Sequence, residues 1–408
     1  MPDTWPRLDP AALHGVCGDI INQFEAHTEA DSVALLVHIL AEFSCMIGRQ
    51  PFVRLDGEPN PLLFWPVVCG DTSKSRKGSA SRRIGRLFKA AFPSWTRGAY
   101  RGTLSSGEGL AFAVRDPEIK IDKSGQPITI DEGVTDKRLY LVQQEFSTVL
   151  SVLNREGSTL SGCLRDAWDG CDLKPMTKNN HVTATQPHVV VTGHITIEEL
   201  QRRLAETEAY NGFANRFCWF AVRRSKFLPF ASDPPKNELD KLIERLREVL
   251  PPIQHVKEIG LTRKAKHAWT TVYPVLSAGR PGMAGSLIGR AESQVRRIAC
   301  LYAMLDQCNT VDIEHLQSAL ALWQHSEQSV GLMFGDRTGD AIADTILAAL
   351  QETQQGLSDT DLSCLFTRHV SAARLHQAKA NLGASGKIDR RLVTTNGRAK
   401  NVWFAVAK

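Results

Sequence analysis

Long apolar runs are absent from this sequence, and none approaches the roughly 18 residues that a membrane-spanning helix needs. The first ten residues lack an apolar centre and contain three prolines, so they do not resemble a signal peptide. The nine cysteines include no C-x-x-C pair. That scatter favours reduced, mostly buried thiols over a metal site and, with the other two absences, predicts a cytoplasmic protein with no membrane partner.

What remains is the composition of an ordinary globular chain. Apolar residues make up 42% and charged residues 23% of the 408 positions, and a chain of this length predicts two or three domains. The net charge of +5 permits a nucleic-acid partner without requiring one.

Three short apolar segments have the character of strands, and the first of them, a continuous apolar run, suits a strand that is covered on both faces. They are residues 62–69, 138–143 and 188–192, and a helical pattern follows each of them. Strand, loop and helix repeated in this order predict an α/β fold with a mostly parallel sheet. Residues 11–48, before the first strand, are predicted to form helices.

The rest of the chain divides by pattern. Residues 118–137 alternate around a Ser-Gly turn and predict an inserted β-hairpin. After the linker 233–236, residues 237–334 are predicted to be helical. From residue 339, three short helices and two strands around Asn396-Gly397 predict a winged helix.

The segment G-D-T-S-K-S-R-K-G-S, residues 70–79, lies where the first strand ends. A phosphate-binding loop needs inward-turned backbone N–H groups, a lysine for the outer phosphates and a hydroxyl for Mg²⁺. Gly70 and Gly78 supply the permissive backbone. Lys77 is the candidate phosphate lysine, and Ser79, which opens the next helix, is the candidate Mg²⁺ ligand. The other loop positions predicted to bind the nucleotide are Thr72, Ser73, Lys74, Ser75 and Arg76.

The loop departs from the common spacing G-x-x-x-x-G-K-[ST]. It is one residue longer, Arg76 stands in place of the second glycine, and Gly78 separates the lysine from the serine. Between Lys74 and Arg101 there are nine Lys or Arg and no acid, which suits a polyanion. The alternative interpretation is a basic surface loop before an amphipathic helix.

Glu145 closes the second predicted strand, where ligands bind in such sheets. A carboxylate there can orient the water that attacks the γ-phosphate. Its neighbour is Gln144, where an acid that helps to hold Mg²⁺ is usual. The alternative interpretation of Glu145 is a solvated strand end. Thr192 and His194 lie at the end of the third predicted strand, where a polar group can sense the γ-phosphate, although a structural histidine is the alternative.

Three arginines are candidates for contacts with the nucleotide. Arg216 lies between aromatic residues, so we expect it to project while they pack; an arginine paired with an acid or stacked on Trp219 is the alternative. Arg290 and Arg297 are seven residues apart and share a helix face, either toward a nucleotide or toward solvent and acids.

Together these parts resemble the AAA+ ATPases, especially their minichromosome-maintenance-like helicase branch. They are more closely similar to a family of bacterial, plasmid and phage proteins of unassigned function found in primase–helicase-like replication proteins. The matching segments span roughly residues 15–330 and are GDTSKSRKGS, LSSGEGL, DKRLYLVQQEFSTVL, REGSTLSGCLRDAWDG, TGHITIEEL and NGFANRFCWFAVRRSK.

The resemblance implies a role for each candidate. Lys77 and Ser79 would form the Walker A site and Glu145 the Walker B site, with ATP and Mg²⁺ as cofactors. His194 falls near the sensor 1 position, Arg216 matches the arginine finger and Arg290 the sensor 2 arginine. For Glu108 a capping, a hairpin-positioning and a functional role all stay open. The implied domains are an N-terminal helical region (1–60), an AAA+ core (61–232) with the hairpin 118–137, a helical lid (237–334) and a winged helix (339–408).

The function that follows is an ATP-driven DNA motor, a helicase of a mobile element, plasmid or phage that works as a homo-oligomeric, hexameric ring. ATP would lie between subunits, and a separate primase is a possible partner because no priming motif precedes residue 60. The predicted DNA contacts are Lys120, Lys123 and Lys137 in the hairpin and Arg374, Lys379, Arg390, Arg391, Arg398 and Lys400 in the tail. For the tail, a protein-binding winged helix is the alternative.

Two other functions stay open. One is an ATP-gated DNA-binding initiator or regulator without unwinding activity. The other is a scaffold with a degenerate nucleotide site, which Gln144 and the altered loop would fit.

Overall fold

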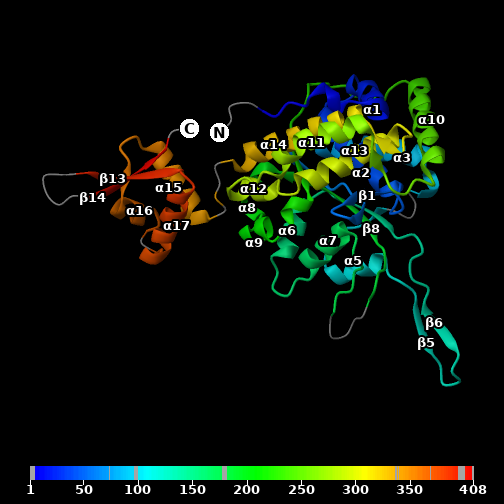
Figure 1. The fold of residues 1–408 in the computed structure, drawn as a ribbon, viewed down its shortest axis with the longest axis horizontal. Helices are drawn as coiled ribbons and strands as arrows, with labels where there is room; N and C mark the ends of the chain where they lie inside the picture. Colours follow the sequence, from blue (N-terminus) through cyan, green and yellow to red (C-terminus); the bar gives the residue numbers. More distant parts are fainter. Residues whose placement is uncertain are drawn as a thin grey trace. The chain divides into compact units, whose positions relative to one another are not determined.

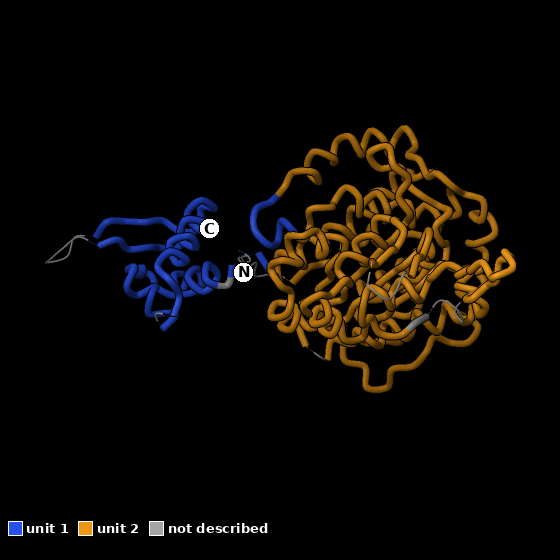
Figure 2. Tube along the Cα trace, turned by 90° about the horizontal axis from the view of Figure 1, so that it is seen from below, with its two compact units in different colours: residues 1, 280–286, 334–408 blue, residues 2–279, 287–333 orange. Residues whose placement is uncertain are grey.

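The computed structural model describes residues 5–72, 74–95, 100–176, 182–335, 338, 340–367, 369–393 and 400–406. Ser73 and Arg398, two of the predicted site residues, lie outside this part. The chain forms two compact units, distinguished by colour in Figure 2: residues 2–279 with 287–333, and residues 280–286 with 334–408. Among the described residues, no helix has both the length and the apolar character needed to cross a membrane.

Figure 1 shows the elements of the larger unit. Its helices are α1 (Gly15–Glu25), α2 (Ser32–Met46), α3 (Lys77–Ala91), α5 (Gly107–Ala113), α6 (Phe146–Leu153), α7 (Leu160–Asp169), α8 (Ile197–Arg203), α9 (Glu206–Tyr210), α10 (Lys236–Ile253), α11 (Arg263–Ser277), α13 (Ala291–Leu305) and α14 (Ile313–Phe334). The short helix α12 (Gly282–Leu287) falls almost entirely in residues 280–286, which are grouped with the smaller unit. Its strands are β1 (Phe52–Leu55), β2 (Glu58–Pro61), β3 (Pro66–Gly70), β4 (Tyr100–Arg101), β5 (Glu118–Ile121), β6 (Pro127–Asp131), β7 (Arg138–Gln143), β8 (His188–Thr196), β9 (Cys218–Val222), β10 (Gly260–Leu261) and β11 (Thr310–Val311). Short 3₁₀ turns lie at Pro10–Ala12 and Ala214–Arg216.

The centre of this unit is a five-stranded sheet in the order β4-β7-β8-β3-β9, and all its strand pairs are parallel. The fold is therefore α/β with a parallel sheet, as the sequence predicts. Parallel strands need crossover connections, and here helices lie between the successive strands of the sheet. The carboxyl ends of β3, β7 and β8 consequently meet at one edge of the sheet.

Helix α2 covers this sheet and is itself covered. Fourteen of its residues, Val33–Met46, are buried, and it contacts β7, β8 and β3 as well as α1, α3 and α13. A helix that is apolar all round has no face left for water, so it belongs in the interior. This placement brings His38 of α2 close to the polar ends of the strands.

Several predicted boundaries were wrong. Residues 62–65 are fully buried, but β3 begins only at Pro66. Ser44 donates to the Leu62 carbonyl and accepts from the Phe64 N–H, and the Trp65 carbonyl accepts from the Cys218 N–H of β9. An apolar run reports burial and not strand pairing. Strand β8 continues to Thr196, which leaves Thr192 inside the sheet, where it donates to the Tyr140 hydroxyl. The region predicted to be only helical before residue 60 contains the hairpin β1–β2.

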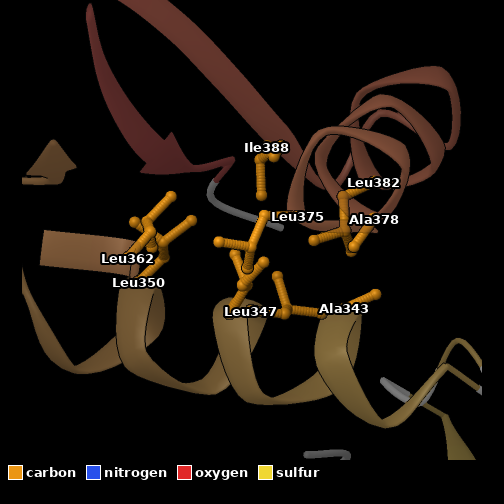
Figure 3. Close-up of a cluster of buried hydrophobic side chains, with 9 residues drawn as sticks. Ala343, Leu347, Leu350, Leu362, Leu375, Ala378, Leu382 and Ile388 are labelled. Carbon is orange, nitrogen blue, oxygen red and sulfur yellow. The ribbon is translucent and has the colours of Figure 1, made fainter. Parts of the chain in front are cut away.

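The second unit contains α15 (Ala341–Glu352), α16 (Asp359–Leu365) and α17 (Ala372–Ala384), followed by a sheet. Its strands β12 (Leu357–Ser358), β13 (Ile388–Val393) and β14 (Lys400–Ala405) pair in the antiparallel order β12-β14-β13. Figure 3 shows its core, where side chains of the three helices and of Ile388 point toward one another. This unit therefore has a hydrophobic core of its own.

Replacing Leu382 by Ala is expected to destabilise this second unit by about 2–5 kcal/mol, because the change leaves a cavity in a closed core. Leu365→Ala is the matched control, since Leu365 is 41% exposed on α16. Chemical denaturation followed by fluorescence of Trp403, the tryptophan of this unit that packs against the core, measures both. Equal losses in the two variants would contradict the assignment of the core.

Acid is expected to destabilise the larger unit through its buried histidines. Burial lowers the pKa of His38 to about 3 and those of His188 and His325 to about 4, and it lowers the pKa of His194 well below its ordinary value. In the unfolded chain these groups titrate at about pH 6.5. The free energy of unfolding is therefore unaffected above that pH and falls as the pH drops toward 4. Each histidine contributes at most about 1.4 kcal/mol per pH unit. Urea unfolding at pH 7.5 and 5.5 measures the slope, which His325→Asn should reduce and His267→Asn, at an exposed position, should not.

Candidate functional site

The predicted loop joins β3 to α3 at the carboxyl edge of the sheet. All of β3 is buried, and α3 begins at Lys77, two residues before the predicted start at Ser79. No acid lies in the first turn of α3, and no side chain caps it. The N-terminus of this helix therefore offers its partial positive charge and backbone N–H groups to an anion. Ser79 lies in this first turn, where its hydroxyl fits a Mg²⁺ ligand.

Arg76 adopts the left-handed backbone conformation with φ of +62° immediately before the helix. Glycine adopts this conformation without strain, whereas another residue pays about 1–2 kcal/mol. The ion pair between the Arg76 Nε and the Glu29 carboxylate, at 2.6 Å, holds the side chain outside the loop. The backbone turn that a second glycine would give is thus present, although the residue is arginine.

Lys77 folds over the loop from the first turn of α3. Its ammonium donates to the Thr72 carbonyl at 3.2 Å and to the Ser75 hydroxyl at 3.0 Å. Burial lowers its pKa, and the negative charges of Asp71, Glu145 and Glu199 act in the opposite direction. The ammonium of Lys77 therefore adds its positive charge to the partial positive charge of the helix N-terminus, and both favour an anion at the loop. Lys74 and Thr72 of the loop are exposed, and Ser75 is buried.

Gly70 has no room for a side chain under this loop. A Cβ there would lie 2.0 Å from the Ser75 hydroxyl and 2.4 Å from the Lys77 ammonium. At Gly78 the nearest atoms, of Arg82 and Gln144, would be at 3.3 and 3.4 Å. The loop is therefore packed directly on the end of β3, and less tightly over Gly78.

Gly70→Ala is expected to displace Lys77. For the ATP hydrolysis that the sequence predicts, kcat/KM should then fall by roughly 100-fold, the cost of about 1 Å of misplacement. Gly78→Ala should have a smaller effect, and Gly162→Ala, with no atom within 4 Å of the new carbon, should have none. Steady-state hydrolysis and nucleotide titration measure the series. Gly70→Ala with wild-type kinetics would show that the tight contact plays no part in the site.

Gln144 and Glu145 follow β7 at the same edge of the sheet and are both exposed. Glu145 is the N-cap of α6, and its charge acts on Lys77. Gln144 lies beside Gly78 at the start of α3. The structure thus brings together the loop and the end of β7, which are about 70 residues apart in the sequence.

His194 lies on β8, between β7 and β3, and is 2% exposed. Its Nδ1 is 3.1 Å from the Gln144 Oε1, and its Nε2 is 3.0 Å from the His38 Nε2. The predicted sensor histidine is therefore inside the sheet, and it reaches the loop through Gln144.

Arg216 does not project, contrary to the prediction. It is 6% exposed, and its guanidinium binds the Asp169 carboxylate and the Gly212 carbonyl and lies over the Trp168 ring. An arginine between packed aromatic residues finds an acid of its own chain, because a buried guanidinium needs a partner. Its position is at the amino end of β9, at the edge of the sheet opposite to the loop.

Arg290 and Arg297 meet Arg216 at Trp168 and Asp169. The three guanidiniums lie 5.0, 3.7 and 5.6 Å from the centre of the Trp168 ring, respectively. Arg297 is fully buried and donates to Asn60, so it faces the interior instead of sharing the exposure of Arg290, which is the N-cap of α13. Burial lowers the pKa of Arg297 to about 9, so it remains a cation at neutral pH.

The hairpin β5–β6 extends from the body of the larger unit (Figure 1). Lys137 does not belong to its exposed part: its ammonium binds the Val114 and Arg115 carbonyls and Asp116, and it anchors the base. Lys120 is exposed and paired with Glu118, and Lys123 is exposed in the turn. Four isoleucines of the hairpin β5–β6 are also exposed, each by 47% or more: Ile119, Ile121, Ile128 and Ile130.

In the second unit, three of the five predicted DNA contacts that the structure describes already have acidic partners. Arg374 pairs with Asp340 and Arg391 with Asp389. Lys379 is the clearest correction: it is bound to Asp359, lies over the Trp403 ring and is largely buried. Arg390 and Lys400 are exposed on β13 and β14.

Sequence reasoning missed two residues around the loop, Glu199 and His38. Glu199, whose charge acts on Lys77, accepts from Thr196 at the end of β8, and T-x-x-E after a strand is a helix-start signal that could have found it. His38 gave no signal, because one histidine in an apolar helix suggests only core. Glu108 has a structural contact: it lies in the first turn of α5 and accepts from Thr159.

A cluster of His14, Asp306 and His315 lies at a cleft of about 990 Å³, which Asp306 helps to line. The described residues that line this cleft do not belong to the loop 70–79. Both rings contact the same oxygen of Asp306, at 2.5 and 3.2 Å. The Asp312 N–H donates to the His315 Nδ1, so the single ring proton lies on Nε2 and points to Asp306. A metal would need that lone pair, so this geometry favours a hydrogen-bonded cluster.

The site residues that come together are a helix N-terminus, a lysine, a hydroxyl and a carboxylate, at the edge of the sheet where ligands bind. This set fits a phosphate chain with Mg²⁺. A scan against protein-family models and a search of curated proteins found no match to this chain.

Proposed function

We propose that this chain binds and hydrolyses ATP at the loop 70–79. The observation that carries the proposal is the position of Lys77 at the uncapped start of α3, at the same edge of the sheet as Glu145. Glu145 is exposed and follows strand β7. Lys77 and the N–H groups of α3 would bind the outer phosphates, Ser79 would ligate Mg²⁺, and Glu145 would orient the attacking water. The order of the parallel strands and this site support assignment of the larger unit to the AAA+ fold.

The position of Arg216 supports a site shared between two copies of the chain. Pro66 of β3 pairs with Cys218, and Gly70 pairs with Val222, so the loop and Arg216 lie at opposite ends of adjacent strands. Four steps along a strand separate them by roughly 13 Å before the loop itself is counted. One chain does not place both groups on one phosphate. A head-to-tail ring would do so if Arg216, which is bound to Asp169 within the chain, exchanged that partner for the phosphate of the neighbouring copy. Arg290, beside Arg216, would come from the same neighbouring copy.

The partner that we propose is DNA, and the biological role is that of a ring-shaped motor, a helicase of the replicative type. The acid-free basic stretch 74–101, the exposed Lys123 of the hairpin, and Arg390 and Lys400 of a winged-helix-like tail support this partner. Because Lys137 and Lys379 are occupied within the chain, the remaining exposed bases carry this part of the proposal.

The test is hydrolysis by the purified chain with and without single-stranded DNA. We expect ATP turnover that DNA stimulates, and absence of any hydrolysis would refute the enzyme. The second candidate is an ATP-gated initiator or regulator, which the separate tail unit favours. Strand displacement on a forked duplex distinguishes them: a motor unwinds it, whereas a regulator binds it without unwinding.

A further inference from the structure

A chain of hydrogen bonds runs from the interior of the larger unit to the phosphate loop. It begins at His38 on α2, passes through His194 on β8 and ends at the exposed Gln144. His38 is 1% and His194 is 2% exposed, and burial lowers the pKa of both, so both rings are neutral. Each ring therefore has one proton to place.

Only two arrangements of these protons satisfy both contacts. In the first, the His194 Nδ1 donates to the Gln144 oxygen, and the His38 Nε2 donates to the His194 Nε2. In the second, the Gln144 amide is reversed and both protons move one place toward α2, which leaves a proton on the His38 Nδ1. That nitrogen is buried and has no hydrogen-bond partner. A buried N–H without an acceptor costs more than an unused lone pair, so the first arrangement is favoured.

The first arrangement determines what Gln144 offers to a ligand. Its oxygen is held by His194 and is also the Gln144 atom nearest to Gly78, where a Cβ would be 3.4 Å away from it. The NH₂ group belongs to an exposed side chain and has no hydrogen-bond partner among the residues that the structure describes. A carboxylate in this place could only accept hydrogen bonds, for example from a Mg²⁺-bound water, whereas the amide of Gln144 also provides N–H donors.

We propose that His38, His194 and Gln144 form a positioning chain that presents the Gln144 amide as a hydrogen-bond donor to the outer phosphate of the bound nucleotide. His38 is a positioning residue, because it acts through His194. Gln144 thus replaces the usual acid with a phosphate contact, and Mg²⁺ binding depends on Ser79 and the phosphates. This inference rests on the proposed ATPase function.

The kinetic test compares His38→Phe with His38→Gln. Phenylalanine removes the donor, and kcat should fall by roughly 10–100-fold with less than about a threefold change in KM for ATP or in the Mg²⁺ activation constant. Glutamine keeps an N–H donor at the position of Nε2 and should restore most of kcat. His325→Phe is the matched control, because His325 is a buried histidine on α14 that does not take part in this chain of hydrogen bonds. It should leave kcat unchanged.

Wild-type kcat in His38→Phe would overturn the proposal, and so would an equal loss in both His38 variants, because a purely structural role would give that result. Gln144→Glu should lower kcat, since it replaces the donor by an acceptor beside phosphate; an increase in kcat would also overturn it.

A second measurement separates this proposal from the proposed function. In ¹⁵N-histidine-labelled protein, long-range ¹H–¹⁵N spectra report the tautomer of each ring, with His38 and His194 assigned through their variants. We expect His38 protonated on Nε2 and His194 on Nδ1, and the reverse would refute the chain whether or not ATP is hydrolysed. Wild-type protein with these tautomers and no hydrolysis would refute the ATPase instead, together with the phosphate contact that rests on it.

Discussion

Lys77→Ala is expected to abolish ATP hydrolysis, with a loss of roughly 10²–10³-fold in kcat/KM, the range found when one donor to the reacting oxygens is removed. The lysine is held over the loop by the Thr72 carbonyl and the Ser75 hydroxyl, next to the helix N-terminus. Its charge and the helix N–H groups would neutralise the phosphates together, so the helix alone is not enough. A coupled assay of phosphate release measures the effect, and nucleotide titration shows whether binding is lost as well.

Lys89→Ala is the matched control, because Lys89 lies exposed in the last turn of the same helix α3. It should hydrolyse ATP at the wild-type rate. If Lys77→Ala does the same, the loop is not a catalytic phosphate site, and the basic surface loop becomes the better interpretation. Thermal unfolding of both variants shows that a loss of activity is not a loss of folding.

A mixture of Arg216→Ala and Glu145→Gln subunits is expected to regain hydrolysis that each variant alone has lost by roughly 10³-fold or more. The two residues lie at opposite edges of the sheet, so each variant keeps one intact half of a shared site. With random mixing in equal amounts, one interface in four combines the two intact halves, so about one quarter of the wild-type activity should return.

Glu145→Gln mixed with Lys77→Ala is the control, because both changes affect the same half of the site and no interface is restored. Recovery in that mixture, or no recovery in the first one when the rings assemble, would refute the shared site. Removal of Arg216 also leaves Asp169 with less positive charge around it. Arg216→Lys keeps that charge but not the two-pronged geometry, so it separates stability from catalysis.

Much of this architecture followed from local patterns. The parallel α/β sheet was predictable because residues 138–143 and 188–192 are apolar on both faces, and a strand with that pattern needs helices on both sides. The loop at 70–79 was predictable because the glycine, lysine and serine residues that suggest it follow one another closely in the sequence. The helices after residue 236 and the tail elements followed from periodicity and turn residues for the same reason.

The partners of individual side chains depended on segments far apart in the sequence. Arg216 was expected to project, yet it binds Asp169, 47 positions earlier, and Lys137 is tied to the base of the hairpin. A basic side chain in a sequence shows its charge but not the acid that the fold brings to it. The left-handed turn at Arg76 was also not predictable, because the common phosphate-loop pattern has a glycine at this position. In the structure Arg76 adopts that turn, and its ion pair with Glu29 holds the side chain outside the loop.

The sequence by itself determined the class of fold and the position of the loop 70–79 after a strand and before a helix, since both depend on periodicity and on neighbouring residues. The tertiary structure alone decided that His38 and His194 meet, that Gln144 keeps its oxygen for His194, and that Arg216 lies at the edge opposite to Lys77. These facts depend on the order of strands in the sheet and on the burial of α2 against it. Both arise from long-range packing, in which residues more than 100 positions apart share one hydrogen bond.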